Sequence, residues 1–202
     1  MTKEELITFT SEIKEHWEVG RIHCPWHACG GNEEQLIEYF TRVKLNDWCF
    51  STWRNNYHWL LKTNDADFLR HKILIENNSM HIIDLDRKFI STAIVGGNCA
   101  PAVGVAKAIK LKGGTNHVHL FCGDGCADEG FFWEALRYAQ GQDLPITFVI
   151  ENNNRSVCTP VKDRWGDNDT WIEKLKNEPK VYYYEYEAVY PHCGTGQFVR
   201  LM

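Results

Sequence analysis

Two short apolar runs, separated by a helix-length segment, dominate the pattern of the central part of the chain. The first run covers 117–122 and stops at a Gly-Asp-Gly turn, and the second covers 146–150 and stops at Glu-Asn-Asn. Short apolar runs bounded by turn residues are typical of buried strands, and an amphipathic helix between them completes a βαβ unit. The pattern predicts parallel strands with polar residues at their carboxyl ends, where α/β sheets bind ligands.

Spacing elsewhere in the chain predicts further helices and strands around this unit. Residues 2–5 fit a capping box, and Leu6, Phe9, Ile13 and Trp17 recur at helical spacing, which predicts an N-terminal helix for packing or subunit contact. Other helices are expected at 34–43, 55–61, 102–112 and 170–176, with strands at 47–54 and 180–189. The polar, mixed stretch 64–76 predicts no element. The expected fold is α/β, with a mostly parallel central sheet and helices on both of its faces.

Length and charge limit the classes of function. The 202 residues suffice for one domain, taken as 1–202, because no linker-like stretch divides them. The net charge of −5, from 22 basic and 27 acidic residues, leaves no basic stripe for nucleic acid or for an anionic membrane. No apolar run of about 18 residues and no signal-peptide pattern is present, so we expect a cytoplasmic protein without membrane contact.

The eight cysteines do not form a recognisable disulfide or zinc pattern. None lies in a CxxC spacing, and Cys24 and Cys29 are separated by four residues. We therefore expect free thiols that pack as small apolar side chains. Cys126 is a separate case because it follows the Gly-Asp-Gly turn, and its backbone N–H is the group of interest.

The polar residues at the two strand ends have the chemistry of a magnesium–diphosphate site. Asp124 and Asn153 are 29 residues apart, about one strand-to-strand repeat, so adjacent parallel strands would bring them to one edge of the sheet. The carboxylate, the amide oxygen and the backbone carbonyl of Arg155 would bind Mg²⁺, and the flanking glycines would let backbone N–H groups approach an anion. The alternative is a structural strand–turn–helix without any ligand.

These motifs resemble those of a known enzyme family. A Gly-Asp-Gly followed about thirty residues later by paired asparagines resembles the thiamine diphosphate fingerprint. Between them the chain contains, in order, Glu129-Gly130, Trp133-Glu134-Ala135 and Leu144-Pro145. HACGGNE at 27–33 and FSTWR at 50–54 resemble phrases of the α-subunit of the thiamine-dependent first component of 2-oxoacid dehydrogenase complexes, which includes the pyruvate, branched-chain and acetoin enzymes. The resemblance covers roughly residues 19–195 and implies a thiamine diphosphate-binding fold.

The resemblance also implies roles for individual residues. His27 and Arg54 would bind the cofactor diphosphate, which suits the donor geometry of guanidinium and imidazole. Trp53 takes the place of a tyrosine that touches the cofactor. The remaining implied cofactor contacts are backbone groups of Ala93 and Val95 at the aminopyrimidine, the Gly-Asp-Gly turn with the residue after it (Gly123, Gly125 and Cys126), and His192 on a late loop.

His58 and His192 are the candidate catalytic histidines, although the chain departs from the family pattern around both. Asn56 replaces the first histidine of the pair that would include His58, and the spacing around His192 is not that of the family. The Gly-Gly that the family places before Ser-Met-His is also absent at 77–78. These departures concern local loop geometry and access of substrate.

The function that the resemblance implies is that of a cofactor-anchoring α-subunit dependent on thiamine diphosphate and Mg²⁺. The activating glutamate would come from a β-subunit in an α2β2 heterotetramer, because no glutamate here lies in a motif for that role. The expected reaction is decarboxylation of a 2-oxoacid with acyl transfer, the cofactor supplying the reactive carbon. Two alternatives stay open: a split transketolase-like subunit that moves a ketol unit between sugars, and a non-catalytic binding or regulatory homologue.

Overall fold

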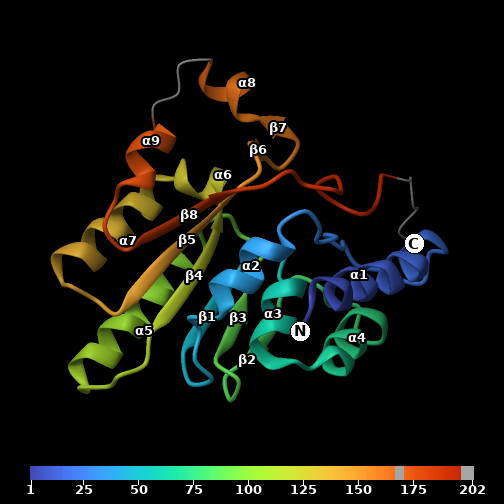
Figure 1. Cartoon of the computed structure of the whole chain (residues 1–202), viewed down its shortest axis with the longest axis horizontal. Coiled ribbons are helices and arrows are strands. Elements are labelled where there is room, and N and C mark those ends of the chain that lie inside the picture. Colours follow the sequence, from blue (N-terminus) through green and yellow to red (C-terminus); the bar gives the residue numbers. More distant parts are fainter. Residues whose placement is uncertain (167–170, 197–202) are drawn as a thin grey trace.

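The computed structural model of the protein describes residues 1–166 and 171–196, and its centre is a mostly parallel sheet (Figure 1). Within these residues the main sheet has six strands in the order β2-β3-β1-β4-β5-β8, and only β2 runs antiparallel to its neighbour. The strands are β1 (Trp48–Ser51), β2 (Ile83–Asp84), β3 (Phe89–Ser91), β4 (Val118–Gly123), β5 (Ile146–Asn152) and β8 (Val181–Glu185). The mixed α/β fold with a mostly parallel sheet is confirmed.

Helices cover both faces of this sheet. One side of the sheet carries α1 (Lys3–Glu18), α2 (Glu33–Phe40), α3 (Asn56–Thr63) and α4 (Ala66–Leu74). The other side carries α5 (Cys99–Leu111), α7 (Gly130–Gly141) and α9 (Trp171–Lys176). A short helix α6 (Asp124–Ala127) follows β4, and beyond the end of β5 lie the hairpin β6 (Arg155–Ser156) and β7 (Thr159–Pro160) and helix α8 (Val161–Trp165).

The predicted βαβ unit is present as β4, α7 and β5. The two strands pair in parallel along the whole of β4, with Gly123 opposite Glu151. Residues 118–122 are all buried, as expected of a strand with helices on both sides. Because the register is fixed, the turn after β4 and the asparagines after β5 emerge at the same edge.

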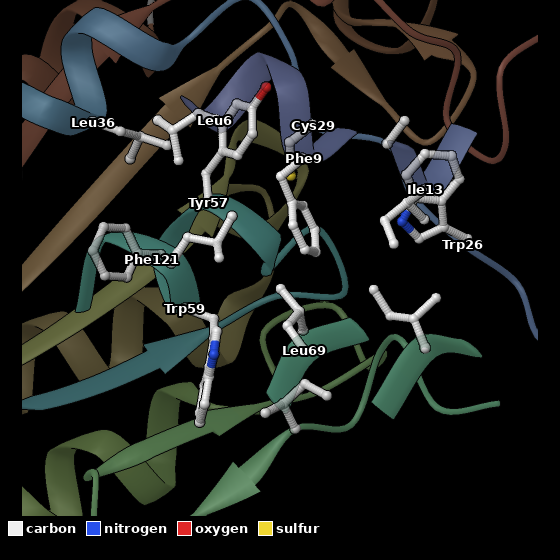
Figure 2. Close-up of a cluster of buried hydrophobic side chains, with 14 of the residues drawn as sticks. Leu6, Phe9, Ile13, Trp26, Cys29, Leu36, Tyr57, Trp59, Leu69 and Phe121 are labelled. Carbon is white, nitrogen blue, oxygen red and sulfur yellow. The ribbon is translucent and has the colours of Figure 1, made fainter. Parts of the chain in front are cut away.

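Side chains of the strands alternate between two hydrophobic clusters. Phe121 and Val149 face the cluster formed with α1 to α4, whereas Leu120, Phe148 and Ile150 face the cluster formed with α5 and α7. Figure 2 shows the first cluster, in which side chains of α1, α3 and α4 meet Phe121 of the sheet.

Helix α1 begins as the sequence predicts. The Thr2 hydroxyl accepts a hydrogen bond from the Glu5 N–H at 3.2 Å, and the Glu5 carboxylate accepts one from the Thr2 N–H at 2.7 Å, which completes the capping box. All four residues at helical spacing (Leu6, Phe9, Ile13 and Trp17) are buried in the first cluster. The packing role is confirmed, and a subunit contact stays a prediction.

The structure corrects several element boundaries. The stretch 64–76 contains α4, and Asp65 caps its N-terminus by accepting a 3.0 Å hydrogen bond from the Phe68 N–H. Only two residues of this helix, Leu69 and Ile73, are fully buried. Such a narrow apolar stripe gives a weak periodic signal. The late strand ends at Glu185 instead of continuing to 189, because Val189 N–H donates to the Gly30 carbonyl of another loop. Residue 170 of the expected helix 170–176 lies outside the described residues.

Among the helices that the structure describes, none is both long and apolar enough to cross a membrane.

Candidate functional site

The carboxyl ends of β1, β4 and β5 surround an inner cavity of about 80 Å³. An outer groove of about 710 Å³ adjoins it, because both are lined by Arg54, Asn153, Arg155 and His192. The inner cavity brings together ten of the predicted site residues: Trp53, Arg54, Val95, Gly123, Asp124, Gly125, Cys126, Asn153, Arg155 and His192. His27, His58 and Ala93 are not part of its lining. The ligand-binding roles of these residues stay predictions, but most of the set shares one cavity.

Asp124 is a buried carboxylate whose hydrogen bonds are incomplete. It is 8% exposed, and its Oδ2 atom has no hydrogen-bond partner among the described residues. Burial raises the pKa of this carboxyl from 3.8 to about 7, although the backbone N–H of Gly125 and the charge of Arg164 oppose the shift. A buried acid with a free oxygen atom is stabilised by a cation, so this position fits a metal ligand.

The neighbouring oxygen atoms are also suited to a hard cation. The Asn153 amide donates to the Tyr186 hydroxyl at 3.2 Å, and its Oδ1 accepts the Arg155 N–H at 3.1 Å. These two bonds hold the asparagine at the cavity and leave one lone pair of Oδ1 available. A carboxylate, an amide oxygen and a backbone carbonyl are ligands that Mg²⁺ accepts, so the residues fit the ion that the motif implies.

Gly125 is required by the close approach of the β6–β7 hairpin to the turn. A Cβ atom at this position would lie 2.3 Å from Ser156 Oγ and 2.8 Å from Ser156 Cβ. A Cβ atom at Gly123 would meet nothing within 4 Å. The two glycines of the motif therefore differ in their structural role.

We expect Gly125→Ala to destabilise the chain by about 1–3 kcal/mol, because the hairpin must move to admit the new methyl group. Gly123→Ala is the matched control and should leave stability unchanged or raise it by about 0.4–1 kcal/mol, because its φ is −75° and its surroundings are open. Urea unfolding of both variants measures the difference. Equal midpoints would contradict the packing described.

A second group of predicted residues gathers where three loops meet. The ring of His27 lies 4.8 Å from that of His192 and 5.9 Å from that of Trp53. Arg54 donates to the carbonyl of Ala28 and, at 3.1 Å, to that of His192. The late loop is fixed by a 2.7 Å bond from the Gly194 N–H to the Trp26 carbonyl.

The electrostatics of this group favour an anion. Burial, with the nearby charge of Arg54, lowers the pKa of His27 to about 3, so the imidazole is neutral at neutral pH. Its buried Nδ1 has no partner among the described residues. Arg54 contacts carbonyl groups and, in the described part of the chain, forms no ion pair with a carboxylate. The guanidinium can therefore exchange its carbonyl partners for the oxygens of a phosphate.

His58 lies behind the cavity wall. It is 1% exposed, its Nδ1 is 2.7 Å from Ser51 Oγ, and its Nε2 is 3.1 Å from Glu151 Oε1. These contacts show His58 supporting Glu151 and not facing the cavity. Its catalytic role stays a prediction that this position does not favour.

Glu151 is a cavity residue that sequence reasoning missed. Its Oε1 atom accepts hydrogen bonds from His58, from the Tyr184 hydroxyl and, at 3.2 Å, from the Asn32 amide. The available signal is its position directly after the apolar run 146–150, at the same strand end as Asn153. Glu151 joins β5 to α3, to β8 and to the loop before α2.

Ala93 and Val95 also differ from each other. Val95 lines the inner cavity together with Thr92 and Ile94, whereas Ala93 is half-buried outside the lining. The predicted backbone contact of Ala93 stays a prediction that this position does not favour.

Comparison with known proteins agrees with this arrangement. The model of the family described as "Dehydrogenase E1 component" matches residues 3–169. The α-subunit of acetoin:2,6-dichlorophenolindophenol oxidoreductase from Bacillus subtilis is 31% identical over 165 residues, which are 77% of this chain and 50% of that protein. The corresponding subunit of Cupriavidus necator is 29% identical over 193 residues (86% and 58%).

Pyruvate dehydrogenase subunits are similar too. The pyruvate dehydrogenase E1 component subunit alpha of Rickettsia prowazekii is 27% identical over 162 residues, 76% of this chain and 50% of that protein. The chain thus spans about half the length of the curated relatives it matches.

Proposed function

Because the chain belongs to the dehydrogenase E1 component family, we propose that it anchors thiamine diphosphate and Mg²⁺ as the α-subunit of a 2-oxoacid-decarboxylating enzyme. The observation that carries the proposal is the buried carboxylate of Asp124, which has a free oxygen in a cavity shared with Asn153 and Arg155. The proposal treats the chain as one domain in a cytoplasmic enzyme.

The residues divide into metal ligands and anion donors. Asp124, the Asn153 amide oxygen and the Arg155 carbonyl would hold Mg²⁺, and the metal would offset the cost of the buried acid. Arg54, His27 and His192 would bind the diphosphate, together with backbone N–H groups at Gly125 and Cys126. When bound, the cofactor supplies a nucleophilic carbon and an electron sink for the carbanion left by C–C cleavage.

The chain's own residues would bind and orient this charged end and keep water from it. Glu151 is a carboxylate at the cavity, but its Oε1 already accepts three hydrogen bonds. We therefore place the activating glutamate on a β-subunit, with the site at the interface of an α2β2 assembly. Acyl transfer to an acceptor would follow decarboxylation in the assembled enzyme.

The experiment that tests this function is reconstitution. The purified chain alone should show no turnover of pyruvate, of other 2-oxoacids or of acetoin in the presence of thiamine diphosphate, Mg²⁺ and a redox dye. The partner that co-purifies with it should restore turnover. Full activity of the chain alone, or of the pair on sugar phosphates only, would contradict the proposal.

A further inference from the structure

Three thiols from three different elements meet in the wall of the inner cavity. Cys99 is the first residue of α5, Cys122 lies near the end of β4, and Cys126 lies in α6. Their sulfur atoms all lie within 4.8 Å of one another, and the Sγ atoms of Cys99 and Cys126 are 3.8 Å apart. All three side chains are buried and line the cavity. The three cysteines have no CxxC spacing and come together only in the folded chain, so a search for sequence motifs does not find this cluster.

The spacing of the sulfur atoms suits a common ligand. Zinc–thiolate bonds are about 2.3 Å long, which places sulfur atoms about 3.8 Å apart around a tetrahedral ion and about 4.0 Å apart around a trigonal one. The observed separations need shifts of less than about 1 Å to reach either geometry. We propose that Cys99, Cys122 and Cys126 form a site for a thiophilic divalent ion of the Zn²⁺ or Cd²⁺ class, with the open position toward the cavity.

The surroundings of the cluster favour a thiolate at Cys99. Cys99 begins the thirteen-residue helix α5, and the Asn98 side chain does not cap this helix, because its amide donates to the Ser51 carbonyl at 2.8 Å. The positive end of the helix dipole therefore acts on the Cys99 sulfur. Arg54 and Arg155 line the same cavity. Binding of one divalent ion would release three thiol protons and leave a net charge of −1 that these groups can balance.

Packing alone does not account for this arrangement. Cys24, Cys29 and Cys49 are also buried, yet among the described residues the cavity cluster is the one group of three potential ligands whose atoms converge. Its soft sulfur ligands select a different ion from the hard oxygen atoms of Asp124 and Asn153. The inference therefore does not rest on the proposed function, and it is tested without thiamine diphosphate.

The test is a Cd²⁺ titration of a chain in which the two exposed thiols are removed by Cys158→Ser and Cys193→Ser. Under argon, with a phosphine reductant, we expect one Cd²⁺ per chain, an ultraviolet sulfur-to-cadmium charge-transfer band and three sulfur neighbours in X-ray absorption. Adding Cys122→Ala should weaken binding at least about 100-fold, because a ligand is lost. Cys49→Ala, an equally buried thiol of β1 on the other face of the sheet, is the matched control and should bind as before.

Two results would overturn the proposal. One is a parent chain without the charge-transfer band or with fewer than three sulfur neighbours, a measurement that does not depend on the folding of any cluster variant. The other is unchanged Cd²⁺ affinity in a Cys122→Ala chain whose circular dichroism matches that of the parent.

Discussion

Replacing Asp124 with asparagine should make the ligand-free chain more stable above pH 7 and abolish its response to magnesium and thiamine diphosphate. Burial raises the pKa of this carboxyl to about 7, whereas the unfolded chain ionises it near the ordinary value of 3.8. The folded state therefore binds the proton more tightly, and stability is lost as pH rises from about 4 through about 7. At pH 8 the charged form costs on the order of 4 kcal/mol, at about 1.4 kcal/mol per pKa unit.

Asparagine has no charge to bury, so the free energy of unfolding of Asp124→Asn should exceed that of the wild type by up to about 4 kcal/mol at pH 8. The difference should shrink toward pH 4. Urea unfolding at several pH values, without metal, measures this effect. Asp86→Asn, at an exposed residue of the loop between β2 and β3, is the control and should change stability at pH 8 by less than about 0.5 kcal/mol. A destabilised Asp124→Asn chain at pH 8 would mean that the carboxylate already has a strong partner.

Among the substitutions predicted here, loss of the Glu151 carboxylate should lower the free energy of unfolding the most. Glu151→Ala would remove the common acceptor of His58, Tyr184 and Asn32, which come from segments far apart in the chain. Buried donors left without a partner lose their hydrogen bonds without regaining water. We expect a loss of about 3–5 kcal/mol, as for the removal of one member of a buried pair.

This loss is a large part of the total stability of a typical domain, about 5–15 kcal/mol, so Glu151→Ala should unfold at a much lower urea concentration. Glu134→Ala, at an exposed residue of α7, should change stability by less than about 0.5 kcal/mol. Glu151→Gln keeps an acceptor oxygen and should lose less than the alanine variant. Equal stability of Glu151→Ala and Glu134→Ala would show that the hydrogen bonds to the Glu151 carboxylate do not stabilise the fold.

The parts of the fold that the sequence could predict depend on local periodicity. The strands ending at Gly123 and Asn152 consist mainly of apolar residues, and the single helix between them predicts that they are parallel neighbours, as observed. The shared edge of Asp124 and Asn153 follows from that geometry alone. Helix α1 is likewise marked by its cap and by four apolar residues at helical spacing.

The parts that could not be predicted depend on contacts between distant segments. Glu151 meets His58 across 93 residues and Asn32 across 119, and no local pattern reports such pairs. The convergence of the three thiols has the same origin, since Cys99 begins α5 whereas Cys122 lies in β4 and Cys126 in α6. His58 shows a different limit, because its family phrase does not report that the fold buries the side chain behind the cavity wall; its catalytic role stays a prediction.

The central claim is that Asp124 and its neighbours anchor a magnesium–diphosphate group. The most direct measurement is calorimetric titration of the wild-type chain with thiamine diphosphate, with and without Mg²⁺, and of Asp124→Ala in parallel. We predict saturable binding that requires Mg²⁺ and weakens at least about 100-fold in Asp124→Ala, because the principal charged ligand is lost. No binding by the wild type, or equal binding by Asp124→Ala, would contradict the account and favour a turn without ligand in a non-catalytic homologue.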